Sequence, residues 1–202
     1  MNYSAVILAA GKGTRYNGSK QDVVFHGKPL WRYPYDTCCE IINKDRIVVV
    51  GKDIPGGSTR SISVLNGLNA LPTDTNRVVI LEAARPMVTK QQIVQLLINS
   101  CPSVSFVRPL VNTVIYRNGI YINRDSLYDL LTPQAFDYQM LLKAYQSGKF
   151  IDLTDDTRVM FEYYGIHPFF IETDSNLFKV TYPGDLDMIE LIYKRLIYQV
   201  KK

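Results

Sequence analysis

The sequence predicts an α/β fold with a doubly wound, mostly parallel sheet, and two observations carry this prediction. First, four short runs are continuously apolar rather than alternating, which is typical of parallel strands covered on both faces. Second, segments with helical character separate these runs, so strand and helix alternate along the chain. The runs are residues 4–10, 46–50, 77–81 and 103–107, and the helical segments are residues 30–42, 61–71 and 90–99.

The alternation gives way to a hairpin after the fourth run. Residues 113–117 and 120–123 flank Asn118-Gly119, a pair that is strongly preferred in tight hairpin turns. We therefore expect a short β-hairpin arm at about residues 111–124. The chain shows no internal repeat, low-complexity tract or linker, so residues 1–202 are expected to form a single domain that carries this arm.

The rest of the chain is predicted from capping residues and apolar runs. Asp, Ser and Thr before a helix accept hydrogen bonds from its first N–H groups, and glycine commonly ends a helix. The expected elements are a helix from Asp137 through Ser147, a helix capped by Thr154 or Asp155 and ending at Gly165, strands over residues 167–172 and 176–181, and an amphipathic helix over residues 184–200 with Pro183 in its first turn.

The charge balance says little about partners by its size alone. Lys and Arg number 23 and Asp and Glu 19, which gives a net charge of +4, too small to argue for nucleic acid. A small anionic ligand suits this surplus at least as well. The composition is 47% hydrophobic and 21% charged, which excludes a disordered or fibrous chain.

The cysteines and the hydropathy pattern predict where the protein resides. Cys38, Cys39 and Cys101 are odd in number and lack metal-ligand spacing, as expected of thiols in a reducing compartment. No stretch approaches the roughly 18 apolar residues that a membrane helix needs, and the N-terminus does not resemble a signal peptide. We expect a cytoplasmic protein without a membrane or nucleic-acid partner.

A glycine-rich loop follows the first apolar run. Gly11 and Gly13 allow a tight backbone turn that exposes N–H groups to an anion, and Arg15 and Lys20 add positive charge nearby. A phosphate chain fits this combination. The loop is neither a Walker loop nor Gly-x-Gly-x-x-Gly, because Tyr16 stands where the third glycine belongs. On these residues alone, an ordinary strand–helix turn with two solvated cations remains an alternative.

Motifs elsewhere in the chain favour the phosphate-binding interpretation. In order, they are Ala9-Ala-Gly-Lys-Gly-Thr-Arg15, Lys20-Gln21, Gly27-Lys-Pro-Leu30, Gly56-Gly-Ser-Thr-Arg60, Ser63-Val-Leu-Asn-Gly-Leu68, Ala83-Ala-Arg-Pro86, Leu131-Thr-Pro-Gln-Ala-Phe136, Thr154-Asp-Asp156 and Asn176-Leu-Phe-Lys-Val-Thr181. Together they resemble the cytidylyltransferases of methylerythritol phosphate and ribitol phosphate, in the nucleotide-diphospho-sugar transferase superfamily. The resemblance implies a Rossmann-like sheet of the glycosyltransferase-A type.

The resemblance also implies a reaction and its partners. A phosphate oxygen of a sugar or alditol phosphate attacks the α-phosphorus of CTP, Mg²⁺ holds the triphosphate, and pyrophosphate leaves. Such transfer depends on positioning and charge stabilisation more than on a nucleophilic side chain, so the cations matter and no Ser/His/Asp set is needed. In the family the hairpin arm crosses to a second subunit, which implies a homodimer with composite sites.

Individual roles are carried over at matching positions. The four catalytic candidates are Arg15 and Lys20, which match the pair at the α-phosphate, and Arg124 and Lys179, which match the cations that place the second substrate's phosphate. The nucleotide-binding candidates are Ala9, Ala10, Gly11, Lys12, Gly13, Gly57, Ser58, Ser63 and Glu82, and the substrate-binding candidates are Thr113, Arg124 and Lys179.

Three of these assignments have further interpretations. Glu82 stands where the family has Asp, and its carboxylate is expected to hold Mg²⁺ or a ribose hydroxyl. Ser63 is equally suited to capping a helix, and Arg124 to a surface salt bridge. Lys179, between Phe178 and Val180, requires an anionic partner if it points inward.

The chain departs from the family pattern at the first loop. Ser19 precedes Lys20 where proline is usual, and the stretch between Gly13 and Lys20 is shorter. These departures, Glu82 and the short arm slightly favour a ribitol-phosphate-like substrate for surface polysaccharides over methylerythritol phosphate for isoprenoids. Two other functions stay open: a molybdenum-cofactor nucleotidyltransferase, and a non-catalytic nucleotide-binding protein on the same fold.

Overall fold

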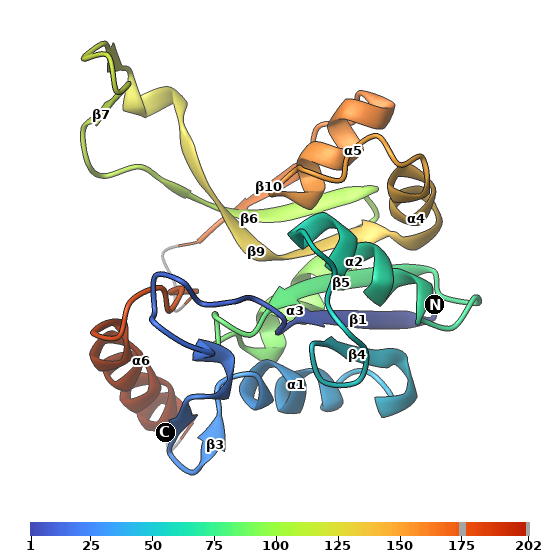
Figure 1. Ribbon diagram of the computed structural model, residues 1–202, viewed down its shortest axis with the longest axis horizontal. Helices are drawn as coiled ribbons and strands as arrows, with labels where there is room; N and C mark the ends of the chain where they lie inside the picture. The colour runs from blue at the N-terminus through green and yellow to red at the C-terminus, as the bar shows by residue number, and fades with distance from the viewer. Residues whose placement is uncertain (174–176, 201–202) are drawn as a thin grey trace.

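A six-stranded sheet with the order β10-β6-β9-β5-β1-β4 forms the centre of the protein (Figure 1). The computed structural model describes residues 1–173 and 177–200. The strands are β1 (Tyr3–Leu8), β4 (Ile47–Val50), β5 (Arg77–Glu82), β6 (Ser103–Pro109), β9 (Tyr128–Asp137) and β10 (Phe169–Glu172). Only β9 runs against its neighbours β5 and β6, while the other pairs are parallel. The predicted mostly parallel sheet is confirmed.

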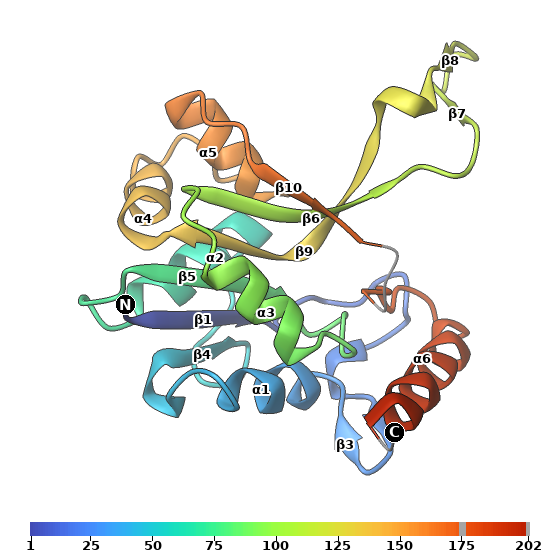
Figure 2. The ribbon, with the colours of Figure 1, turned by 180° about the vertical axis from the view of Figure 1, so that it is seen from behind.

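Helices cover both faces of this sheet, as Figures 1 and 2 show. The helices α1 (Arg32–Cys39) and α3 (Lys90–Leu97) pack on one face, and α2 (Arg60–Asn69), α4 (Tyr138–Gln146) and α5 (Asp156–Tyr164) on the other. Successive strand residues point to opposite faces, so Val6 joins one core and Ile7 the other, and both are fully buried. This double burial explains why the strands are continuously apolar.

The helix boundaries agree closely with their capping signals. Asp137 accepts a hydrogen bond from Met140 N at the start of α4, and Asp155 accepts two from the first turn of α5. The cap of α5 is thus Asp155 rather than Thr154. Gly165 ends α5 in the left-handed conformation, with φ of 70°. Short 3-10 helices lie at Lys20–Asp22, Lys44–Arg46 and Arg124–Ser126.

The central antiparallel strand β9 contains the stretch Leu131–Phe136, which the sequence presented only as a motif. Proline cannot donate to a strand ladder and is usually excluded from central strands. Here the register with β6 shifts between Ser105 and Phe106, which pair with Gln134 and Leu131. The intervening Thr132 and Pro133 therefore form a bulge that accommodates the missing N–H group.

The strand predicted over residues 176–181 is wrong for the part that the structure describes, and Asn176 lies outside the described residues. Residues 177–181 belong to no strand. Val180 N donates to Ala84 O at 2.8 Å and the Arg85 guanidinium donates to Leu177 O, so this extended segment is held by isolated contacts. Without a partner strand, an apolar extended segment forms no ladder.

The helix α6 (Asp185–Val200) forms a separate layer with the small hairpin of β2 (Val24–Phe25) and β3 (Lys28–Pro29) (Figure 1). Its Ile189 packs with Phe25, Leu30 and Val180 in a third apolar cluster. The helix thereby supports the backbone next to Lys179. In the part of the chain that the structure describes, no helix is long and apolar enough to cross a membrane.

The strands β6 and β9 lead into an arm that projects from the body and ends in the hairpin of β7 (Val114–Ile115) and β8 (Tyr121–Ile122) (Figure 1). Its turn is closed by Tyr116 N donating to Ile120 O at 2.8 Å, and Gly119 has φ of 90°. The short hairpin arm is confirmed. Its apolar residues Val111, Ile115, Ile120 and Tyr121 are exposed.

Candidate active site

A cavity of about 410 Å³ opens at the carboxyl ends of β1 and β5, where ligands bind in open α/β sheets. The loops that follow these strands, the loop before α2 and the segment before α6 form its walls. It is lined by Leu8, Ala9, Ala10, Gly11, Lys12, Arg15, Lys20, Gln21, Gly57, Ser58, Thr59, Arg60, Ser63, Glu82, Ala83, Ala84 and Lys179. Eleven of the fourteen residues predicted from the sequence are among them.

Gly13 shapes the first loop without lining the cavity. Its carbonyl oxygen accepts hydrogen bonds from Tyr16 N at 2.8 Å and Gly18 N at 3.3 Å, so the loop closes on itself. Gly13 has φ of 61°, and a Cβ atom there would lie 1.8 Å from Gly18 O. Only glycine satisfies both requirements, and the short loop keeps Arg15 at the cavity.

Three of the five cations that line this cavity, Arg15, Lys20 and Lys179, come from the first loop and from the segment before α6. Lys20 Nζ donates to Val180 O at 2.8 Å, while Arg15 is exposed and Lys179 is partly exposed. Burial, together with the charges of Lys179 and Arg15, lowers the pKa of Lys20. Because these like charges disfavour one another, the site is electrostatically suited to a polyanion that neutralises them.

Glu82, at the end of β5, is the acidic partner that Lys179 requires. Its Oε2 lies 2.5 Å from Lys179 Nζ, and its Oε1 lies 3.5 Å from Arg60 Nε. Although burial raises the pKa of the Glu82 carboxyl, the neighbouring charges of Lys179 and Arg60 hold it below its usual range. Glu82 is thus an ionised carboxylate at the wall of the cavity.

The single carboxylate among the described residues of the cavity is compatible with a nucleotide-bound magnesium ion. Among the described residues that line the cavity Glu82 alone is acidic, and no described group of three or more His, Cys, Asp or Glu residues is placed to hold a metal. Mg²⁺ is commonly held by one or two carboxylates plus substrate phosphates and water. A single carboxylate beside a cationic cavity fits that mode.

The loop before α2 is fixed by Ser63. Ser63 Oγ accepts a hydrogen bond from Gly57 N and donates one to Thr59 O, both at 3.0 Å. The helix cap is Thr59, whose Oγ1 accepts from Ile62 N, so the interpretation of Ser63 as a helix cap is wrong. A Cβ atom at Gly57 would lie 2.2 Å from the Ile62 side chain, so this loop requires glycine.

Thr113 and Arg124 lie outside the cavity of their own chain. Both belong to the arm, where the Arg124 guanidinium donates to Val111 O and lies 3.8 Å from the Asp125 carboxylate. Of the three second-substrate candidates, a single chain therefore brings only Lys179 to the cavity. The surface salt bridge expected as an alternative for Arg124 is present, with its two charges 3.8 Å apart.

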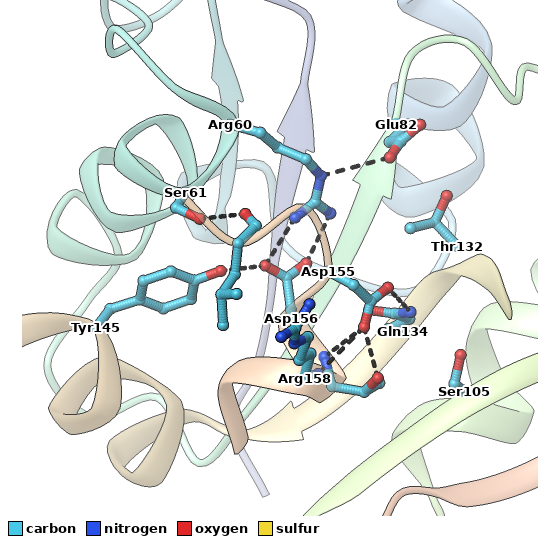
Figure 3. Close-up of polar contacts among 12 residues, drawn as sticks. Arg60, Ser61, Glu82, Ser105, Thr132, Gln134, Tyr145, Asp155, Asp156 and Arg158 are labelled. Carbon is cyan, nitrogen blue, oxygen red and sulfur yellow. Dashed lines mark hydrogen bonds and ion pairs between the residues drawn. The ribbon is translucent and has the colours of Figure 1, made fainter. Parts of the chain in front are cut away.

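Sequence reasoning missed a polar cluster that joins cavity-lining Arg60 to the buried residues Asp156 and Tyr145 (Figure 3). Arg60 forms a two-pronged ion pair with Asp156, and Tyr145 also donates to Asp156. Both charged residues lie within quoted motifs, but no role was assigned to them. Arg85, which is not among the catalytic candidates, has a structural role, because its Nε donates to Thr132 Oγ1 at 3.0 Å.

Fold and cavity together define a Rossmann-like α/β protein whose cationic cavity suits a polyanionic ligand, and comparison with known proteins gives the family. The family model for 2-C-methyl-D-erythritol 4-phosphate cytidylyltransferase matches residues 3–195. The chain belongs to this family, and is a CTP-dependent cytidylyltransferase.

The relatives and solved structures are similar over nearly the whole chain. The enzyme of this name from Clostridium botulinum (strain 657) is 32% identical over 229 residues, which covers 96% of this chain and 98% of that protein. The Thermotoga neapolitana enzyme is also 32% identical, and the alignment covers 94% of this chain and 96% of that protein. The 229 aligned positions exceed the 202 residues here, so this chain lacks internal segments of the Clostridium enzyme.

Two solved structures share the fold. The bifunctional IspDF of Campylobacter jejuni superposes with a TM-score of 0.82 at 25% identity, covering 94% of this chain and 55% of that one. The 2-C-methyl-D-erythritol 4-phosphate cytidylyltransferase of Thermus thermophilus superposes with a TM-score of 0.78 at 22% identity, covering 96% and 100%.

Proposed function

We propose that this enzyme transfers the cytidylyl group of CTP to 2-C-methyl-D-erythritol 4-phosphate and releases pyrophosphate. The observation that carries the proposal is the cavity in which Arg15, Lys20 and Lys179 converge beside the loops at Gly11 and Gly57. The relatives described above are named for this substrate, which favours it over ribitol phosphate. Neither of these relatives is named as a molybdenum-cofactor enzyme, so they do not support the molybdenum-cofactor alternative.

In the proposed reaction, a phosphate oxygen of the acceptor attacks the α-phosphorus of CTP. The new P–O bond forms as the bond to the bridging oxygen breaks, and that oxygen leaves with the pyrophosphate. Negative charge rises on the α-phosphate and on the leaving group, and Lys20 and Arg15 stabilise it from the first loop. Because Lys20 is held by Val180 O before the substrate arrives, it needs little reorganisation during the reaction.

Glu82 is the residue that we propose for the divalent cation. A bound Mg²⁺ would neutralise part of the triphosphate charge. Lys179 has two roles in this proposal. It orients Glu82 through their 2.5 Å ion pair, and it presents a cation to the phosphate of the second substrate. The backbone around Gly57 and Ser58 is proposed to contact the cytosine edge, with Ser63 holding that backbone in place.

The second substrate is proposed to bind between two copies of the chain. Thr113 and Arg124 lie on an arm with exposed apolar residues and outside the cavity of their own chain, so the site is complete only if a partner's arm reaches it. A homodimer follows, with residues 1–202 as one cytidylyltransferase domain. We also propose a cytoplasmic location, in keeping with three free cysteines.

Pyrophosphate release from purified protein tests the proposal. The protein is incubated with Mg²⁺, each of the four nucleoside triphosphates and a panel of phosphates that includes methylerythritol phosphate and ribitol phosphate. We expect release only with CTP and chiefly with methylerythritol phosphate. Release with GTP contradicts the roles of Gly57 and Ser58, and release with ribitol phosphate alone contradicts the proposed acceptor. CTP binding without release from any acceptor indicates a non-catalytic nucleotide-binding protein.

A further inference from the structure

Arg60 occupies a position that is unfavourable for a cation by itself. It is the first residue of α2, directly after the cap Thr59, and the amino end of a helix carries partial positive charge. Two acidic side chains offset this arrangement. Arg60 Nη1 and Nη2 donate to the two Asp156 carboxylate oxygens at 2.9 and 2.7 Å, and Arg60 Nε lies 3.5 Å from Glu82 Oε1. The guanidinium therefore bridges two carboxylates (Figure 3).

Asp156 provides a fixed anchor for this bridge. Its side chain is fully buried at the start of α5, and the hydroxyl of buried Tyr145 also donates to it. A bidentate pair sets the plane of a guanidinium as well as its position. Because Asp156 cannot move without losing both partners, the direction of the Arg60 Nε–H, one of the N–H groups that Asp156 does not bind, is fixed as well.

The Arg60 Nε–H lies on the Glu82 side of the bridge. Arg60 Nε is buried and has no hydrogen-bond partner in the described part of the protein, and its nearest recorded charge partner is Glu82. The other Glu82 oxygen contacts Lys179, so the carboxylate is held between two cations, Arg60 and Lys179. An unrestrained glutamate would sample several rotamers instead.

We propose that Arg60 is a positioning residue which, anchored on Asp156, holds the Glu82 carboxylate in the orientation that receives the nucleotide and its divalent cation. This inference rests on the proposed function only in taking the cavity as the CTP site. It assigns Arg60 no contact with the reacting atoms. Lysine cannot substitute fully, because a single ammonium lacks the planar fork that spans both carboxylates.

A double-mutant cycle between Arg60 and Glu82 tests the proposal. Binding of CTP in the presence of Mg²⁺ is measured by calorimetry for the parent, Arg60→Lys, Glu82→Gln and the double variant, together with kcat and KM. Arg60→Lys keeps a cation for Asp156, and we expect it to weaken CTP binding about 10-fold, as is typical of residues that orient a metal ligand. In the Glu82→Gln background the same change should alter binding by less than about 2-fold.

The alternative outcomes separate positioning from general stability. An equal loss in both backgrounds, or CTP binding by Arg60→Lys that equals the parent's, overturns the proposal. We also expect KM for CTP to rise more than kcat falls. The matched control is Asp155→Asn, since Asp155 adjoins the anchor and bonds Gln134 at 2.8 Å without contacting Arg60. Asparagine caps helices as well as aspartate, so this variant should bind CTP as the parent does.

Two further provisions keep the test decisive. If Arg60→Lys fails to fold, the neutral pair Arg60→Met with Asp156→Asn replaces it in the cycle, because it leaves no unpaired buried charge. A parent that binds CTP but does not act on methylerythritol phosphate contradicts the proposed function alone, and the binding cycle still decides the role of Arg60. A parent that fails to bind CTP with Mg²⁺ overturns both proposals.

Discussion

Replacing Lys20 by methionine is expected to separate activity from stability. Methionine keeps most of the apolar stem of lysine but removes the charge. In the folded protein, burial and the neighbouring Lys179 and Arg15 lower the pKa of Lys20, so the fold disfavours its charged form. Its removal relieves that penalty but loses the 2.8 Å hydrogen bond to Val180 O, which is worth about 1–3 kcal/mol. The two effects oppose each other.

The expected result is a net change in the free energy of unfolding of less than about 1 kcal/mol, because these contributions offset one another. In contrast, kcat should fall about 100- to 1,000-fold, the usual cost of removing one preorganised group from the developing charge. Urea denaturation measures the first quantity and pyrophosphate release the second. Lys44→Met is the control, since Lys44 is exposed at the amino end of β4 and lines no part of the cavity.

The result that refutes this reasoning is a Lys20→Met enzyme that turns over as fast as the parent. The shortened loop would then place Lys20 away from the reacting phosphate. A loss of activity that only follows unfolding would equally contradict this reasoning, because the opposing contributions of Lys20 to stability are expected to offset one another.

Three further predictions concern the same cavity. Glu82→Gln should weaken CTP binding with Mg²⁺ about 10- to 100-fold, and unchanged binding would exclude Glu82 from the cation site. Ser63→Ala should lower the free energy of unfolding by about 1 kcal/mol and raise KM for CTP, because Gly57 N loses its acceptor; a KM equal to the parent's would contradict the role of that loop. Because the pKa of Lys20 in the free enzyme is lowered, kcat/KM for CTP should decline on raising the pH at a lower pH than the titration of an ordinary lysine predicts, while the stabilising effect of deprotonating Lys20 grows over the same range. A kcat/KM profile of Lys20→Met with the same alkaline decline would contradict that assignment.

Sequence patterns predicted the sheet well because its signals are local. Continuous apolar runs and capping aspartates depend on neighbours within a few residues, so β1, α4 and α5 were expected near their actual bounds. The segment before α6 shows where this reasoning ends. Its apolar residues around Lys179 are buried by contacts with Ala84 and α6 rather than by a strand ladder, and burial alone does not distinguish the two.

The site residues were predicted largely through motifs. The bridge that Arg60 forms between Asp156 and Glu82 could not be predicted in this way. Arg60 and Asp156 are separated by 96 positions, and their pairing depends on how α2 and α5 pack on the same face of the sheet. The sequence did carry one signal, a cation directly before the helix expected over residues 61–71, where it is electrostatically unfavourable. A charge in such a place requires a counter-charge from elsewhere in the fold.

The most direct test of the central claim is identification of the reaction product by phosphorus NMR. The purified enzyme is mixed with CTP, methylerythritol phosphate and Mg²⁺, with Lys20→Met as the comparison. We predict the coupled signals of a new cytidine diphosphate ester together with pyrophosphate, at a much lower rate with the variant. If CTP and methylerythritol phosphate remain unchanged, or if pyrophosphate appears without the diphosphate ester, the proposed cytidylyl transfer is wrong.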